Sequence, residues 1–100
     1  MDIVDRIVEK RTQILDLCAR YGARNVRVFG SCARDDYTEG SDVDILVNLD
    51  EGLTGFEYFG VIESLREDLE ELLGTRVDVV DEKGLRKTIR EDVLSDAVAL

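Results

Sequence analysis

The sequence contains no histidine, no proline and no tryptophan, and only two of its 100 residues are cysteines. Without histidine, Ser-His-Asp and Cys-His catalysis, imidazole general bases and histidine metal sites are all excluded. The two cysteines match no zinc-binding spacing and are too few for a disulfide framework, which favours reduced thiols in the cytosol. Basic residues are scarce, 13 against 23 acidic ones, and a net charge of −10 argues against non-specific nucleic-acid binding. Any catalysis must therefore be carried by carboxylates.

Long hydrophobic runs are also missing. No apolar stretch approaches the ~18 residues needed to cross a bilayer, and the acidic N-terminus lacks the apolar core of a signal peptide. We therefore expect a soluble, cytoplasmic protein that makes no membrane contact. With 44% apolar residues, the chain is expected to form one small domain, residues 1–100, with a modest core.

The apolar pattern predicts an α-β-loop-β-α-β-α order. Helices are expected over residues 3–20, after a cap at Asp2, over residues 55–73, after a capping box at 54–57, and over most of residues 85–100. Strands are expected at 26–29, 43–49 and 75–80. The helix between the second and third strands is long enough for a right-handed crossover, which would make those strands parallel. The predicted class is α/β (α+β) with a small sheet.

Three aspartates stand in these predicted strands. Asp42 and Asp44 are two residues apart on the second strand, so both point to one face about 6.6 Å apart, and Asp78 can join them from a parallel neighbour. Two such charges repel by roughly 2.5 kcal/mol at an effective dielectric constant of 20. A divalent cation reverses that penalty, and oxygen donors without nitrogen or sulfur suit Mg²⁺ or Mn²⁺. The alternative is that the aspartates merely line the wet face of a half-exposed sheet.

A glycine-serine turn precedes these acids. Gly30-Ser31 ends the first predicted strand, and ten residues separate it from Asp42. Glycine lets backbone N–H groups approach an anion, the Ser31 hydroxyl adds a donor, and Arg34 adds a guanidinium. Although such a dipeptide is often only a turn, phosphate donors beside metal-holding carboxylates describe a nucleoside-triphosphate site.

The segments Gly30-Ser31-Cys32-Ala33-Arg34 and Ser41-Asp42-Val43-Asp44, with Asp78 in Arg76-Val77-Asp78-Val79-Val80, resemble a known signature. It is that of the DNA polymerase beta-like nucleotidyltransferases, and the minimal nucleotidyltransferases are its closest match. The similarity covers nearly the whole chain, although Asp35 stands where relatives often carry glycine.

The resemblance implies a mixed sheet with strands in the order 1-2-3 and helices packed against it. It implies Asp42, Asp44 and Asp78 as catalytic residues and ligands of two Mg²⁺ ions, and ATP as substrate. Its nucleotide-binding residues would be Gly30, Ser31, Arg34 and Ser41. Minimal nucleotidyltransferases are typically paired with a small HEPN-type protein, and as antitoxins they adenylylate a tyrosine of that toxin.

Our first hypothesis is therefore transfer of AMP from ATP to a hydroxyl of a HEPN-type partner, in a hetero-oligomer with it. This reaction requires no histidine, because two metals neutralise the attacking and leaving oxygens and a metal-bound hydroxyl loses its proton more easily. The alternative is a non-catalytic antitoxin that neutralises its partner by contact. A third reading, an antibiotic-modifying enzyme, is disfavoured because 100 residues leave no room for a substrate-binding domain.

Overall fold

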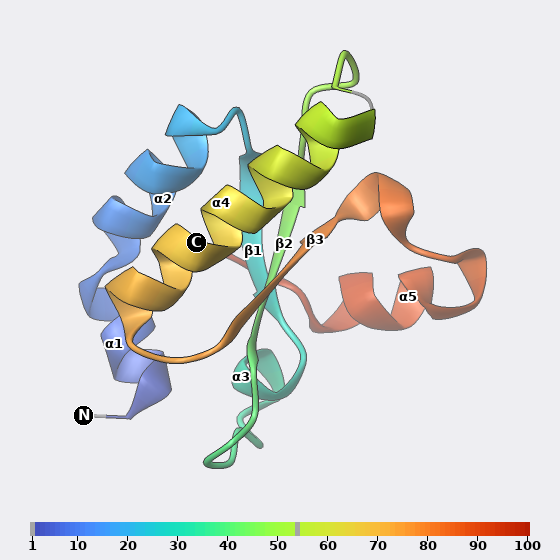
Figure 1. Cartoon of the computed structure of the whole chain (residues 1–100). Helices are drawn as coiled ribbons and strands as arrows, with labels where there is room; N and C mark the ends of the chain where they lie inside the picture. The colour runs from blue at the N-terminus through green and yellow to red at the C-terminus, as the bar shows by residue number, and fades with distance from the viewer. Residues whose placement is uncertain (1, 54) are drawn as a thin grey trace.

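A four-stranded mixed sheet is the centre of the computed structural model, which describes residues 2–53 and 55–100 (Figure 1). The strands are β1 (Arg24–Phe29), β2 (Val43–Asn48), β3 (Val77–Asp81) and β4 (Val98–Ala99), in the order β3-β2-β1-β4. β2 pairs with β3 in parallel and with β1 antiparallel, and β4 pairs antiparallel with the other edge of β1. The predicted mixed α/β class, the 1-2-3 neighbour order and the parallel second and third strands are confirmed.

One face of the sheet is covered by three helices, α1 (Ile3–Glu9), α2 (Arg11–Arg20) and α4 (Gly55–Leu73). Alternation in β2 sends Val43, Ile45 and Val47 into this core, where all three are fully buried. α4 buries Leu65, Leu69 and Leu73 against them, at helical spacing. The opposite face carries the polar positions of the strands, together with the short helix α5 (Lys87–Asp96).

The first predicted helix is divided at Lys10, whose backbone angles (φ −98°, ψ 15°) leave the helical range. The bend keeps one buried stripe on the sheet, formed by Ile3, Ile7, Ile14 and Cys18. Val8 lies outside this stripe and is 65% exposed. The capping box predicted over 54–57 cannot be examined, because its first residue, Thr54, lies outside the described residues.

The predicted C-terminal helix forms over Lys87–Asp96 but does not continue to the chain end, where the sheet instead gains a fourth strand beyond the three predicted. α5 ends at Asp96, Ala97 is extended, and β4 follows, with the N–H of Leu100 donating to the carbonyl of Val26 at 3.0 Å. The free edge of β1 offers backbone hydrogen bonds that a continued helix would leave unmade, which accounts for the change. α5 buries none of its residues fully, and Ile89 is 48% exposed.

Two short irregularities shape the ends of β1. A register shift between Arg24 and Arg27 marks a bulge, with Asn25 at a φ of 52°. After Phe29 the chain turns through Gly30 into α3 (Ser31–Arg34), a single helical turn that ends at Asp35 with a φ of 63°. This left-handed conformation is the one that glycine adopts most easily, and here an aspartate adopts it. Among the described residues, none of the helices is both long and apolar enough to span a membrane.

Candidate active site

The parallel pairing of β2 and β3 places two short motifs side by side. Asp44 is the direct cross-strand partner of Asp78. Two residues earlier along the chain, Asp42 lies beside Arg76, with Arg76 Nε 3.1 Å from Asp42 Oδ1. The backbone pairing reaches this point, because the N–H of Val43 donates to the carbonyl of Arg76 at 2.9 Å. The sheet therefore presents an acid–base pair followed by an acid–acid pair. This juxtaposition follows from the register, because residues two apart on a strand share a face.

Asp44 is a half-buried carboxylate with two other carboxylates beside it. Its pKa is raised from 3.8 to about 6, first because burial penalises the carboxylate and then because Asp78 and Asp42 repel it, while Arg34 opposes the rise. Asp78 itself is exposed to solvent. A carboxylate held near other carboxylates is stabilised by any cation that enters the site.

The turn after β1 is built around Asp44. Phe29, the last residue of β1, is the cross-strand partner of Asp44, and Gly30 follows with a φ of 71°. A Cβ added at Gly30 would lie 2.2 Å from Asp44 Oδ2, closer than any real contact. Both the conformation and the close approach require glycine here. Ser31 then opens the helical turn α3, whose first backbone N–H groups have no helical acceptors.

These groups line an open, polar cavity of about 610 Å³. Six residues that the sequence predicted for the site lie on its walls: Gly30, Ser31, Arg34, Ser41, Asp42 and Asp44. Asp78 does not line the cavity, but it stands next to it as the strand partner of Asp44. The structure thus brings the two predicted halves of the site to one place.

Two of the predicted nucleotide-binding side chains already have protein partners. Arg34 Nη1 lies 3.0 Å from Asp96 Oδ2, and its Nε lies 3.3 Å from Asp36 Oδ2, so that these carboxylates raise the pKa of the guanidinium. The Ser41 hydroxyl lies 3.1 Å from that of Thr38, which steadies the loop before β2. An anion entering the cavity must compete for Arg34.

The carboxylate side chains are of the type that binds a hard divalent cation, but they do not converge on one point in this structure. Within residues 2–53 and 55–100, no three acidic or cysteine side chains converge closely enough to form a metal site as they stand. The Asp42 carboxylate is turned towards Arg76 instead. Carboxylate oxygens and the raised pKa of Asp44 nevertheless favour an entering Mg²⁺ or Mn²⁺. Ligation by Asp42, Asp44 and Asp78 remains a prediction.

Sequence reasoning missed one wall of the cavity and one basic residue. The wall is the C-terminal half of α5, which contributes Asp92, Val93 and Asp96. No local signal marks these residues, because only the tertiary fold brings α5 beside α3. Arg76 had a detectable signal: it precedes Asp78 by two residues, just as Asp42 precedes Asp44.

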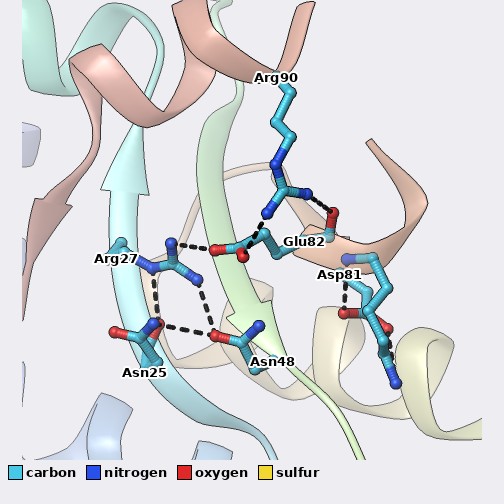
Figure 2. Close-up of polar contacts among 7 residues, drawn as sticks. Asn25, Arg27, Asn48, Asp81, Glu82 and Arg90 are labelled. Carbon is cyan, nitrogen blue, oxygen red and sulfur yellow. Dashed lines mark hydrogen bonds and ion pairs between the residues drawn. The ribbon is translucent and has the colours of Figure 1, made fainter. Parts of the chain in front are cut away.

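A partly buried ion-pair network joins β1, β2 and α5 (Figure 2). Arg27, only 9% exposed, donates to Glu82 Oε1 at 2.6 Å and to Asn48 Oδ1 at 3.0 Å. Arg90 of α5 donates to Glu82 Oε2 at 2.9 Å. Glu82 lies in the 3₁₀ helix η1 (Glu82–Gly84) that follows β3, and its pKa is lowered chiefly by the hydrogen bond from Arg27. The network fixes η1 and α5 on the same face of the sheet as Asp44.

Sequence comparisons relate the chain to known transferases. Residues 10–100 match the profile of the nucleotidyltransferase domain. The chain is 41% identical to the protein adenylyltransferase MntA of Thermococcus cleftensis, over 83% of this chain and 80% of that protein. It is 33% identical to a Methanocaldococcus jannaschii protein provisionally named a protein adenylyltransferase, over 92% of this chain and 95% of that protein.

Solved structures share the same fold. One, provisionally named a minimal nucleotidyltransferase, superposes with a TM-score of 0.85 at 46% identity, over 100% of this chain and 97% of that one. A chain from a crystal structure of a toxin-antitoxin with AMP-PNP superposes with a TM-score of 0.72 over 88% of this chain and 69% of that one. Its identity of 21% establishes a common fold only.

Proposed function

The chain belongs to the nucleotidyltransferase domain family, and from this premise we propose that it transfers AMP from ATP to a hydroxyl group of a partner protein. The observation that carries the proposal is the position of Asp44. It is the cross-strand partner of Asp78 on one side, and its carboxylate lies against Gly30 on the other. The Asp44 carboxylate thereby belongs to a pair of carboxylates and also lies beside the turn proposed to bind phosphate. This is the arrangement that transfer from a metal-bound triphosphate requires.

Asp42, Asp44 and Asp78 would hold the metal, which we propose to be Mg²⁺, with two ions around one triphosphate. When bound, the metal neutralises the charge that develops on the attacking and leaving oxygens. Asp78, which is exposed to solvent beside Asp44, would accept the proton of the attacking hydroxyl. The half-buried Asp44 serves better as a fixed ligand, because Gly30 packs directly against it.

The remaining cavity residues would bind and orient the triphosphate. The backbone N–H groups after Gly30 and the Ser31 hydroxyl are hydrogen-bond donors for the outer phosphates. Arg34 adds a guanidinium once phosphate replaces one of its two carboxylate partners. Ser41 lines the same cavity, where its hydroxyl would donate to the same ligand.

A protein acceptor suits a chain of this charge and size. The net charge of −10 disfavours RNA, whose phosphates would be repelled. The name of the MntA relative describes a protein adenylyltransferase, and structural neighbours include toxin-antitoxin complexes of MntA with HpeT. We propose that this chain acts as the antitoxin of such a pair, on a HEPN-type partner in the cytoplasm.

The test is transfer of label from ATP. The purified protein is incubated with α-labelled ATP, Mg²⁺ and the protein encoded beside it, and the labelled residue is identified by mass spectrometry. We expect one AMP-modified hydroxyl in the wild type and none with Asp44→Asn. Asp16→Asn, which removes an exposed carboxylate from α2, is the matched control and should label normally. Equal labelling by both variants would exclude these carboxylates from catalysis.

Neutralisation of the partner by contact alone is the second candidate. It is favoured by one observation, the exposure of Phe56 (96%) and Phe59 (68%) at the start of α4, away from the carboxylates. Inhibition of the partner that persists without ATP and Mg²⁺, and with Asp78→Ala, would favour this candidate over catalysis.

A further inference from the structure

Arg76 connects three parts of the candidate active site. Its Nε lies 3.1 Å from Asp42 Oδ1, and its Nη2 donates to the carbonyl of Gly40, in the loop before β2. Arg76, Asp42 and Gly40 line the same cavity as Gly30 and Ser31. The two charged side chains are 69% and 47% exposed, so a ligand in the cavity can reach both.

The surroundings distinguish this ion pair from an ordinary surface contact. The next cross-strand pair on the same face is Asp44 with Asp78, two like charges. Without Arg76, the carboxylates of Asp42, Asp44 and Asp78 would be neighbours, and neither β2 nor β3 nor the residue before each strand would place a cation beside them. Arg76 therefore supplies the positive charge beside Asp42 in this structure.

The pair is also easy to exchange. Solvent-exposed ion pairs contribute little, because water competes for both partners. A triphosphate carries more negative charge than one carboxylate and accepts two parallel hydrogen bonds from a guanidinium. Within the part of the chain that the structure describes, the third nitrogen, Nη1, has no hydrogen-bond partner.

We propose that Arg76 is an exchangeable counterion of the site: it neutralises Asp42 before substrate enters and gives its guanidinium to a triphosphate oxygen when nucleotide and metal bind. This inference rests on the proposed function, since it assigns a role towards the same nucleotide. The exchange releases the Asp42 carboxylate for the metal at the moment when the triphosphate brings negative charge. Arg76 is thus a binding residue that couples the two ligands.

The proposal predicts opposite changes in two affinities. Without the guanidinium, Asp42 is free, so the protein alone should bind a divalent cation more tightly. The triphosphate loses a charged donor, so nucleotide should bind more weakly. A residue that only stabilises the loop would weaken both, and one that only contacts phosphate would leave the cation affinity unchanged.

A second exposed ion pair supplies a matched control. Arg24 Nη2 lies 3.7 Å from Asp50 Oδ1, with side chains 68% and 63% exposed. Arg24 begins β1, whereas the site lies at the other end of that strand, about 16 Å away at 3.3 Å per residue. Arg24→Gln removes the same charge at similar exposure, and so corrects for the change in net charge.

The experiment measures binding rather than turnover. Mn²⁺ is titrated into the nucleotide-free protein and followed by electron paramagnetic resonance, and the non-hydrolysable analogue AMP-PNP is titrated with Mn²⁺ present by calorimetry. For Arg76→Gln we expect Mn²⁺ to bind about threefold more tightly and the analogue at least about tenfold more weakly. Arg24→Gln should change neither by more than about 1.5-fold.

Arg76→Lys keeps the charge but loses the planar fork, so it should recover only part of the analogue affinity. If Arg76→Gln weakens both ligands, or matches Arg24→Gln in both titrations, the exchange is refuted while the proposed function stands. If the wild type binds neither Mn²⁺ nor the analogue, the proposed function and this inference both fail.

Discussion

Replacing Asp44 by asparagine is expected to abolish AMP transfer and at the same time to stabilise the folded protein. The carboxylate is half-buried, and the neighbouring Asp78 and Asp42 repel it, so that its pKa is raised to about 6. An asparagine has nearly the same shape and no charge. It therefore keeps the packing against Gly30 and removes the cost of holding an anion there.

The magnitude follows from the pKa. A rise from 3.8 to about 6 corresponds to about 3 kcal/mol of folded-state destabilisation when the group is ionised. Because the side chain is partly solvated, we discount this to about 1.5 kcal/mol at pH 7.5. A raised carboxyl pKa means that the folded state binds the proton more tightly, so the wild type recovers stability as the pH falls through 6. At pH 5 the advantage of the variant should shrink to about 0.8 kcal/mol.

The assay is urea unfolding of wild type and Asp44→Asn at pH 7.5 and pH 5, followed by circular dichroism without metal. Asp16→Asn, on the exposed face of α2, serves as the control and should leave the free energy of unfolding within ~0.5 kcal/mol. Added Mg²⁺ and AMP-PNP should stabilise the wild type and not Asp44→Asn. A variant that is less stable at pH 7.5, or whose advantage does not depend on pH, would refute the reasoning.

Three further predictions concern other parts of the molecule. Gly30→Ala forces a Cβ against Asp44 at positive φ, so it should abolish activity and lower the free energy of unfolding by at least about 1 kcal/mol. Gly60→Ala, inside α4 with free space around it, should raise the free energy of unfolding by about 0.5–1 kcal/mol, measured by thermal unfolding. Glu82→Gln leaves the buried Arg27 without its charged partner and should cost about 3 kcal/mol in urea, while wild-type stability from this pair is lost as the pH falls below about 4.5, through the lowered pKa of Glu82. Both cysteine thiols are buried with pKa values raised to about 11, so alkylation at pH 8 should require unfolding; rapid labelling of the native protein would contradict their placement.

Much of the site was predictable because it depends on patterns among residues that are close in the sequence. Strand alternation alone puts Asp42 and Asp44 on one face. The helix between β2 and β3 is long enough for a crossover, which makes β3 a parallel neighbour of β2 and brings Asp78 beside Asp44. A single glycine before a serine marks the turn after β1. Each of these inferences needs only a few neighbouring residues.

The unpredicted parts depend on tertiary contacts. The apolar spacing of residues 85–100 fits a helix throughout, yet backbone pairing with β1 converts Val98 and Ala99 into a strand. The acidic wall from α5 and the Arg76–Asp42 pair exist only because distant segments meet. Such contacts depend on which edges and faces remain open after the local elements have formed, and local patterns do not contain that information.

The bulge at Asn25 has a consequence for association between copies of the chain. β4 pairs with the outer edge of β1 at Arg27 and Val28, and the N–H of Leu100 adds a hydrogen bond to the carbonyl of Val26. Among the described residues, no partner strand covers Arg24 and Asn25 on that side. An exposed, regular strand edge is a template for aggregation, because its free N–H and C=O groups can pair with another chain. The left-handed residue interrupts the regular spacing of those groups where β4 no longer covers them. We therefore expect the bulge to disfavour edge-to-edge pairing between copies of this small, acidic protein.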